Sequence, residues 1–267
     1  MKRLACYTEL LCLVALSALT TETKVNAVNP SVERSVGGRN VLQNEGNFQA
    51  AITYKRRLTC SGSILSSDMV LTSASCVQDL DLSHIKVRCG SKIFKTGGQV
   101  RSVIEILLHP LYQKDEHMNN IALLKLKRAF NLTSTSINGI KLPKENQKYE
   151  FPSFLFIYGW GISSLNVNGT LSKHLRVSKY KVYSHSKCLR YLSGNDKQND
   201  STAICVGDRS KHFDICNDDS GGPAVNQNQV QYGVISHGGK CFPENVVILT
   251  NIVPHLSWIR NVLRPGK

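Results

Sequence analysis

Short runs of β-branched and aromatic residues, each bounded by Gly, Asn, Ser or Pro, constrain the fold of this chain most. Runs of this kind are typical of strands joined by tight turns. Helical periodicity appears only in 253–263, where Leu256, Ile259 and Leu263 share one face ahead of Pro265-Gly266. The pattern predicts an all-β barrel or sandwich with a C-terminal helix. The expected strands are 63–73, 85–89, 103–108, 121–126, 151–158 and 230–236.

The N-terminus has the pattern of a secretory signal peptide. Lys2 and Arg3 precede an apolar stretch, 10–19, that is too short to span a bilayer. We assign residues 1–20 to the signal, with a boundary as late as Ala27, and 21–34 to a short pro-segment; a buried N-terminal helix is the alternative. No later run reaches about 18 apolar residues, so we expect a secreted, extracellular protein without a membrane span.

The nine cysteines fit an oxidising compartment. No Cys-x-x-Cys pair occurs, so a cysteine zinc site is not expected, and we predict neither a metal nor another cofactor. Removal of Cys6 and Cys12 with the signal leaves seven of the nine, an odd number.

Several motifs, in order and at matching spacing, make residues 35–264 resemble the chymotrypsin-like (trypsin-like, S1) serine protease family. The resemblance implies two six-stranded antiparallel β-barrels with a cleft between them and a C-terminal helix, with one protease domain over 35–267. The motifs are 35–38 after Arg34, 60–65, 71–76, 120–126, 159–161, 216–223, 233–236 and 257–259.

The catalytic positions of the family are only partly kept. Such enzymes use a serine nucleophile, a histidine that takes its proton and a buried aspartate that orients the histidine. Ser220 matches the serine, but Ser75 stands at the histidine position and Asn120 at the aspartate position. His237 is the nearest candidate for a replacement base, although family geometry directs that position away from the serine. His109, His117 and His212 are expected to be loop or structural residues.

Other functional positions of the family are also altered. Asp218 stands at the position of the glycine whose backbone N–H donates to the oxyanion. In the expected remnant of the specificity pocket, Asp214 lies at the floor. Lys240 and Val247 stand at two wall positions where glycines are common. Activation in the family would require cleavage after Arg34, which makes Ser35 the new N-terminal residue. Asp219 would then receive the new amino group. An alternative is that Asp218 turns to solvent and the loop keeps its shape. The two remaining pocket positions are Ser236 and Gly238.

The resemblance also implies three disulfides, Cys60–Cys76, Cys188–Cys205 and Cys216–Cys241, and leaves Cys89 unpaired. Cys89 is then either a buried thiol in a strand or the site of an intermolecular disulfide. Three sequons predict N-glycosylation, at Asn131, Asn168 and Asn199.

These residues predict a secreted, non-catalytic serine protease homologue that acts as a binding protein, cofactor or decoy in an extracellular protease network. The alternative is a weakly active trypsin-like endopeptidase that uses Ser220 with an unorthodox base. The formal charge of +14 suggests an anion-binding site at Lys55, Arg56 and Arg57 for an extracellular protein or an acidic glycan; ordinary solvated charge is the alternative. Nucleic acid is not an expected partner, because aromatic residues do not interleave with the basic ones. A second basic group comprises Lys86, Arg88, Lys92, Lys95 and Arg101.

Overall fold

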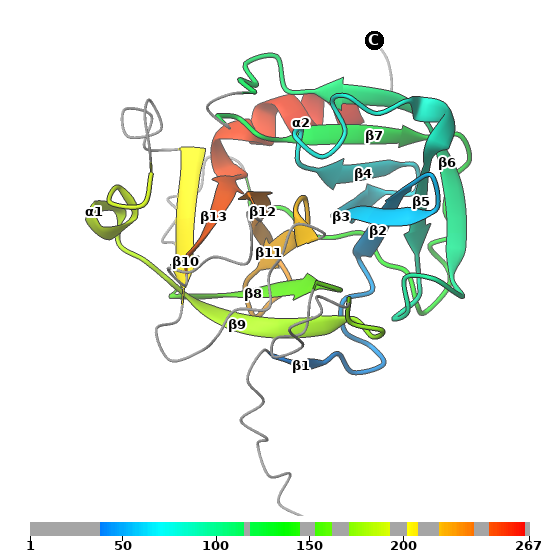
Figure 1. The fold of residues 1–267 in the computed structure, drawn as a ribbon, viewed down its shortest axis with the longest axis horizontal. Helices are drawn as coiled ribbons and strands as arrows, with labels where there is room; N and C mark the ends of the chain where they lie inside the picture. Colours follow the sequence, from blue (N-terminus) through cyan, green and yellow to red (C-terminus); the bar gives the residue numbers. More distant parts are fainter. Residues whose placement is uncertain are drawn as a thin grey trace, which may run out of the picture. The chain divides into compact units, whose positions relative to one another are not determined.

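The computed structural model describes residues 38–114, 118–144, 153–161, 171–192, 202–207, 219–237 and 246–264. These residues form two β-barrels and a C-terminal helix (Figure 1). None of the helices in these ranges has the length and apolarity needed to cross a bilayer.

The first barrel is closed by six antiparallel strands in the order β2-β3-β4-β7-β6-β5. Its interior is filled by aliphatic side chains that alternate along the strands, such as Ile85 and Val87 on β5, both fully buried. The strands are β2 (Gln49–Tyr54), β3 (Arg57–Ser66), β4 (Met69–Thr72), β5 (Ile85–Cys89), β6 (Gln99–Leu108) and β7 (Ala122–Leu126).

The second barrel is formed by six strands in the order β8-β9-β10-β13-β12-β11, and β11 pairs back with β8 to close the ring. The short strand β1 (Arg39–Asn40) pairs antiparallel with the first residues of β9, Arg176 and Val177. A single-turn helix, α1 (His185–Cys188), lies between β9 and β10. The strands are β8 (Phe154–Gly159), β9 (Arg176–Val182), β10 (Ala203–Gly207), β11 (Pro223–Val225), β12 (Gln231–His237) and β13 (Val246–Asn251).

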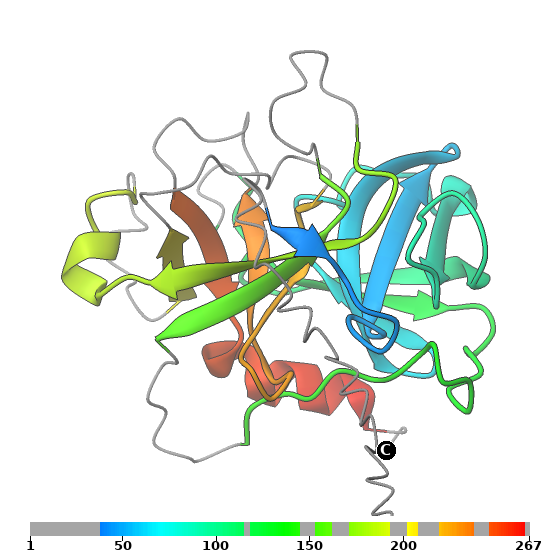
Figure 2. The same cartoon turned by 90° about the horizontal axis from the view of Figure 1, so that it is seen from below.

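The two barrels share buried contacts. Ser63 Oγ on β3 donates to Gln231 Oε1 on β12 at 2.7 Å, and both side chains are fully buried. The C-terminal helix α2 (Leu256–Leu263) packs Leu256 and Ile259 against residues of both barrels (Figure 2). The predicted fold class, two six-stranded antiparallel barrels with a C-terminal helix, is confirmed.

Of the expected strands, 85–89 alone has its observed bounds, and the largest differences concern 63–73 and the C-terminal helix. The run 63–73 is not one strand, because β3 ends at Ser66 and β4 begins at Met69, with a turn in which Ser66 Oγ donates to Asp68 Oδ1 at 3.0 Å. The expected helix 253–263 begins as a 3₁₀ turn, Val253–His255, and becomes α-helical only at Leu256. Pro254 at the start of this segment suits a first helical turn, since its missing N–H has no partner there in any case.

Candidate functional site

Ser75 and Asn120, which lie 45 residues apart, meet through two hydrogen bonds. Ser75 follows β4, and Asn120 precedes β7, the strand that pairs with β4. The Ser75 backbone N–H donates to Asn120 Oδ1 at 2.8 Å, and Asn120 Nδ2 donates to Ser75 Oγ at 3.0 Å. The Asn120 side chain therefore uses both its acceptor and its donor on Ser75.

Asn120 also joins the first barrel to the second. Its Nδ2 donates to the backbone carbonyl of Ser236 at 2.7 Å and lies 3.0 Å from Ser236 Oγ. Thr250 Oγ1 on β13 donates to the Asn120 carbonyl at 3.0 Å. Asn120 is fully buried and uncharged. The position thus holds a neutral polar network in which the amide hydrogens have oxygen acceptors on both barrels.

The Ser220 segment is held by backbone contacts. The Ser61 N–H donates to the Ser220 carbonyl at 2.8 Å, and the Gly221 N–H donates to the Ile235 carbonyl at 2.8 Å. Gly221 has φ of +81°, and a Cβ there would lie 2.1 Å from Thr72 Oγ1. A glycine is therefore required beside the serine, both for backbone conformation and for space.

Asp219 is buried against the segment that follows β8. Its Oδ1 accepts from the Gly161 N–H at 2.9 Å, and only 2% of the residue is exposed. A Cβ on Gly159 would lie 2.0 Å from the same oxygen, so this close approach depends on glycine. Asp219 is thus in an enclosed position, whereas Arg34 and Ser35, its expected partners in activation, lie outside the described residues.

Several predicted site residues are not part of the described structure. They include the oxyanion-hole position Asp218 and most of the pocket remnant, and also the side chain of His237. Val247 is described: its side chain is fully buried in the core of the second barrel, where it belongs to the cluster of Leu155, Val206 and Leu249. The other predicted residues outside the description are Asp214, Gly238, Lys240, Cys216, Cys241, Asn168 and Asn199.

Two of the expected disulfides are present in the structure, Cys60–Cys76 and Cys188–Cys205. Cys89 is a free thiol with 1% of its surface exposed, and burial raises its pKa well above the ordinary value. This placement fits a buried thiol in β5 rather than an intermolecular disulfide. At the sequon beginning at Asn131, Thr133 Oγ1 donates to the exposed Asn131 Oδ1 at 2.6 Å.

A pair of histidines, the buried His255 and the half-buried His109, lies beside the degenerate triad and was not predicted as part of any site. His255 has one ring nitrogen 2.7 Å from the Asn251 carbonyl and the other 3.0 Å from Oδ1 of Asn119, the neighbour of Asn120. His109 packs edge-on against His255 with ring centroids 4.8 Å apart. Burial, and secondarily the charge of His255, lowers the pKa of His109 to about 4; burial also lowers the pKa of His255. These residues are 146 positions apart, so no local pattern could have revealed the pair.

The described residues do not form a group of side chains suited to a metal ion. Within the described ranges, no three His, Cys, Asp or Glu side chains are grouped so that they could hold a metal ion. The groups that contact the Asn120 side chain are hydroxyl and backbone groups.

Comparisons with known proteins agree with this geometry. A family model described as trypsin matches residues 35–259. Trypsin delta of Drosophila melanogaster is 30% identical over 227 residues, which cover 85% of this chain and 87% of that protein. Among solved structures, human heparin binding protein is similar with a TM-score of 0.71 and 26% identity, over 86% of this chain and 98% of that one.

The scabies mite inactivated protease paralogue S-D1 has the same fold, with a TM-score of 0.74 and 23% identity over 85% of this chain and 97% of that one. The family match covers most of the chain, including both barrels and the positions of Ser75, Asn120 and Ser220. The chain therefore belongs to the trypsin-like serine protease family.

Proposed function

We propose that this chain is a secreted, non-catalytic member of its family that acts as a binding protein, cofactor or decoy in an extracellular protease network. The observation that carries the proposal is the pair of hydrogen bonds between Ser75 and Asn120. A family protease needs an imidazole at position 75 to take the proton from Ser220, and a hydroxyl is not basic near neutral pH. In a comparable serine protease, loss of the histidine alone lowers turnover by about 10⁶.

Asn120 supports the same proposal because it is neutral. A carboxylate at this position would stabilise an imidazolium, whereas an amide carries no charge to do so. The alternative, a weakly active endopeptidase, requires a base other than Ser75 that reaches Ser220. No described side chain supplies one in the network around Asn120, which consists of hydroxyl, amide and carbonyl groups. Labelling by a fluorophosphonate that traps active serines separates the two functions.

A binding role needs a surface for a partner, and we propose the turn between β2 and β3. Lys55, Arg56 and Arg57 are all exposed at this turn. Lys55 has φ of +48° and Arg56 has φ of +69°. Two consecutive left-handed residues are required by this type of hairpin turn, and Asn-Gly is the usual choice. Keeping Lys and Arg there costs about 1 kcal/mol or more per residue, which favours a role for these side chains beyond folding.

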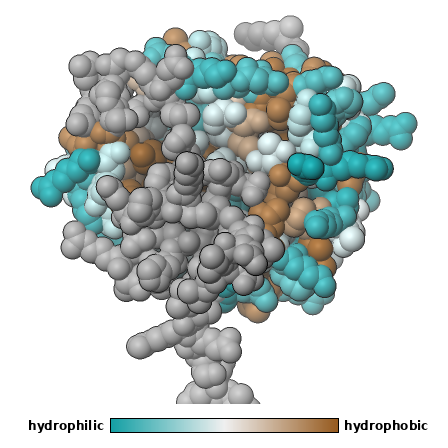
Figure 3. All heavy atoms as spheres, viewed as in Figure 1, coloured by the Kyte–Doolittle hydropathy of each residue, from teal (hydrophilic) through white to brown (hydrophobic). Residues whose placement is uncertain are grey.

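Two further cations extend this surface along β5. Lys86 and Arg88 are two residues apart and so project from the same face of the strand, with Lys86 paired to Thr53 on β2. No carboxylate oxygen in the described part of the chain lies within ion-pair distance of Lys86, Arg88 or the three turn cations. Figure 3 shows hydrophilic side chains gathered over the side of the molecule on which β5 and β6 lie.

The other predicted basic residues contribute less. Lys92 is half-buried and donates to the Glu45 carbonyl and to Asn47 Oδ1. The Arg101 guanidinium lies 5.3 Å from the centre of the Phe130 ring, and its Nε donates to the Ala129 carbonyl at 3.0 Å. The proposed surface comprises the turn cations with Lys86 and Arg88, which also donate to Ser102 Oγ and to the Gly97 carbonyl. It suits an acidic protein segment or a sulfated glycan. The human neighbour named heparin binding protein supports the glycan.

Replacement of Lys55, Arg56 and Arg57 by Ala tests the surface on a heparin column. We expect earlier elution, because exposed cations act on a polyanion through a field screened over about 8–10 Å. The matched control replaces Lys127, Arg128 and Lys144, which are also exposed, and removes the same charge elsewhere. Equal elution of wild type and the turn variant would make the turn ordinary surface, as would an equal shift in both variants.

A further inference from the structure

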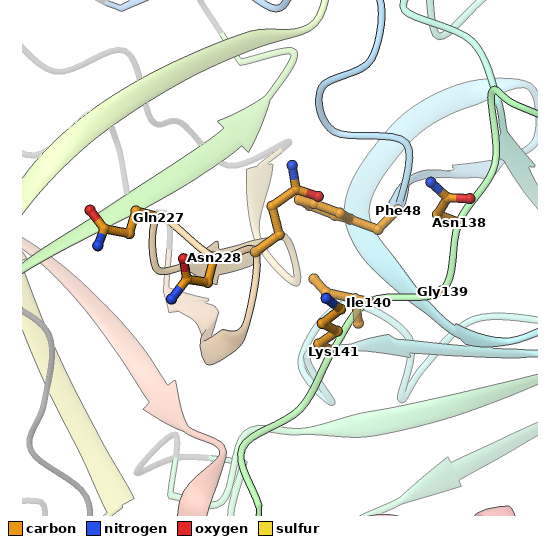
Figure 4. Close-up of a pocket in the computed structure, with 8 residues that line it drawn as sticks. Phe48, Asn138, Gly139, Ile140, Lys141, Gln227 and Asn228 are labelled. Atoms are coloured by element: carbon orange, nitrogen blue, oxygen red, sulfur yellow. The ribbon is translucent and has the colours of Figure 1, made fainter.

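A hollow of about 490 Å³ lies between the turn that joins β11 to β12 and the segment 138–141. Its volume is in the range of pockets that hold small ligands. Figure 4 shows Gln227 and Asn228 across the hollow from Asn138, with Phe48 and Ile140 between them. This hollow contains none of the residues of the Ser75, Asn120 and Ser220 site.

The walls of the hollow are fixed by backbone hydrogen bonds. The Ile140 N–H donates to the Ile64 carbonyl at 2.7 Å, and the Asn138 N–H donates to the Asn47 carbonyl at 3.1 Å. Lys141 bridges the two walls, because its carbonyl accepts from the Gln231 N–H at 2.8 Å. The backbone segments that carry the polar side chains of the two walls are thus held at a fixed separation before any ligand arrives, which lowers the entropy cost of binding.

Asn226 holds the opposite turn with its own side chain. Its Oδ1 accepts from the N–H groups of Asn228 at 2.9 Å and Val230 at 3.0 Å. The next three side chains, Gln227, Asn228 and Gln229, are exposed amides that line the hollow. Within the described residues, neither these three amides nor that of Asn138 makes a side-chain hydrogen bond. The hollow therefore presents four amide groups whose donors and acceptors are not used by the fold.

Gln229 adopts a conformation that its residue type disfavours. Its φ is +58°, in the left-handed region where Gly and Asn are the favoured residues. A glycine would form the same turn with less strain. The amide of Gln229 therefore lies at the hollow although its backbone conformation is strained. Strained backbone conformations of this kind are found at ligand-binding sites.

The chemistry of the lining identifies the ligand class. Each amide offers one oxygen acceptor and two N–H donors, and so matches ligand groups that both donate and accept, as hydroxyl groups do. Phe48 and Ile140 lie at the floor and are buried in the core, so the exposed amides supply most of the surface that a ligand would contact. Among the described lining residues, Lys141 has the one charged side chain, so recognition in the hollow depends mainly on the neutral amides.

We propose that this hollow is a binding site for a short neutral saccharide. Sugar hydroxyls would bind the amides of Gln229, Asn228 and Asn138. The site is independent of catalysis and of the basic surface at Lys55–Arg57. It therefore stands or fails separately from the proposed function.

Isothermal titration of the full chain with maltose, lactose and N,N′-diacetylchitobiose tests the proposal. We expect at least one of these neutral disaccharides to bind with a millimolar or lower dissociation constant. Gln229→Gly should weaken that binding about fivefold to tenfold, because it removes hydrogen bonds to the ligand. The same variant should melt at the wild-type temperature or higher, since it relieves the left-handed strain at Gln229.

Gln113→Ala is the matched control, because Gln113 is an exposed residue that does not line the hollow, and it should bind as wild type does. Failure of all three disaccharides to bind would overturn the proposal. So would equal binding by wild type and Gln229→Gly, which would place the sugar elsewhere. A heparin disaccharide is the final probe: binding of this anion alone, lost on replacing Lys55, Arg56 and Arg57, would assign recognition to the basic surface and overturn the saccharide site.

Discussion

Asn120 Nδ2 donates to the backbone carbonyl of Ser236 at 2.7 Å, a bond that an ionised aspartate at position 120 cannot make. The same amide accepts from the Ser75 N–H through Oδ1 at 2.8 Å. The two bonds fix the orientation of the side chain, because an amide turned by half a rotation would place oxygen against oxygen at Ser236. The hydrogen bonds at position 120 therefore require a side chain that both donates and accepts, as asparagine does.

Asn120→Asp should destabilise the fold. The new carboxylate would be fully buried and would face the Ser236 carbonyl without a proton to donate. We expect the free energy of unfolding at pH 7 to fall by about 1–3 kcal/mol, as measured by urea denaturation. Asn138→Asp, at an exposed position, is the control and should change stability little. An Asn120→Asp variant as stable as wild type would show that the amide is not required.

Ser75→His should not restore a protease by itself. The imidazole would have Asn120 as its neighbour, and an amide in the aspartate position lowers turnover by about 10⁴. We expect hydrolysis of an arginine ester to stay at the wild-type background in Ser75→His. The double variant Ser75→His/Asn120→Asp, assayed beside it, tests whether a charged partner is the missing component. Turnover in the single variant within about a hundredfold of trypsin-like levels would contradict the account.

Stability should fall as the pH drops from about 6.5 towards 5. The pKa of His109 is about 4 in the fold, and that of His255 is also lowered, whereas both are near 6.5 in an unfolded chain. The unfolded state then binds more protons over this range, so acid favours unfolding. We expect His109 to lower the free energy of unfolding by about 1–2 kcal/mol between pH 6.5 and pH 5. This figure already includes a reduction for the partial exposure of the side chain.

Replacement His109→Phe should make this pH dependence shallower, because it removes one of the two groups and keeps an aromatic ring against His255 and Trp258. Unfolding followed at several pH values measures the slope. An unchanged slope in His109→Phe would show that other groups cause the acid sensitivity.

Cys89 should be inert in the folded protein. Its thiol is buried and its pKa is raised well above the ordinary value by burial, so little thiolate is available to react. Mass spectrometry after iodoacetamide treatment should find Cys89 unmodified in the native protein and alkylated in denaturant. A disulfide-linked dimer that disappears in Cys89→Ser would instead support the intermolecular bond.

Alternation of apolar and polar residues predicted best those strands that are clearly bounded in the sequence by turn residues. Strand β5 was expected with its observed bounds, because Ile85, Val87 and Cys89 alternate with charged residues and a glycine follows. The run 63–73 was misjudged because the Ser66–Asp68 turn is set by pairing with other segments: the Leu126 N–H donates to the Asp68 carbonyl at 2.9 Å. Strand β9 buries Val177 and Tyr180 but includes several basic residues. Its sequence therefore lacks the apolar composition by which the other strands were predicted.

The site was predictable only through the family motifs. They placed Ser75, Asn120 and Ser220 at the catalytic positions of the family, but they gave no information on the hydrogen bonds that Ser75 and Asn120 make. The link between Asn120 and Ser236 spans 116 residues, and it depends on how two barrels pack. Likewise, the four amides of the saccharide site come from two segments, Asn138 and 227–229, whose proximity follows from the bridge between Lys141 and Val230.

Reaction of Ser220 with a fluorophosphonate probe tests directly whether this chain lacks an active serine nucleophile. The full chain would be measured before and after treatment with trypsin, so that cleavage after Arg34 is not the limiting step, with an active trypsin as positive control and Ser220→Ala as the matched variant. The account predicts no labelling of Ser220 above the level of Ser220→Ala in either sample. Stoichiometric labelling that is lost in Ser220→Ala would contradict it and would identify the chain as an active protease with an unconventional base.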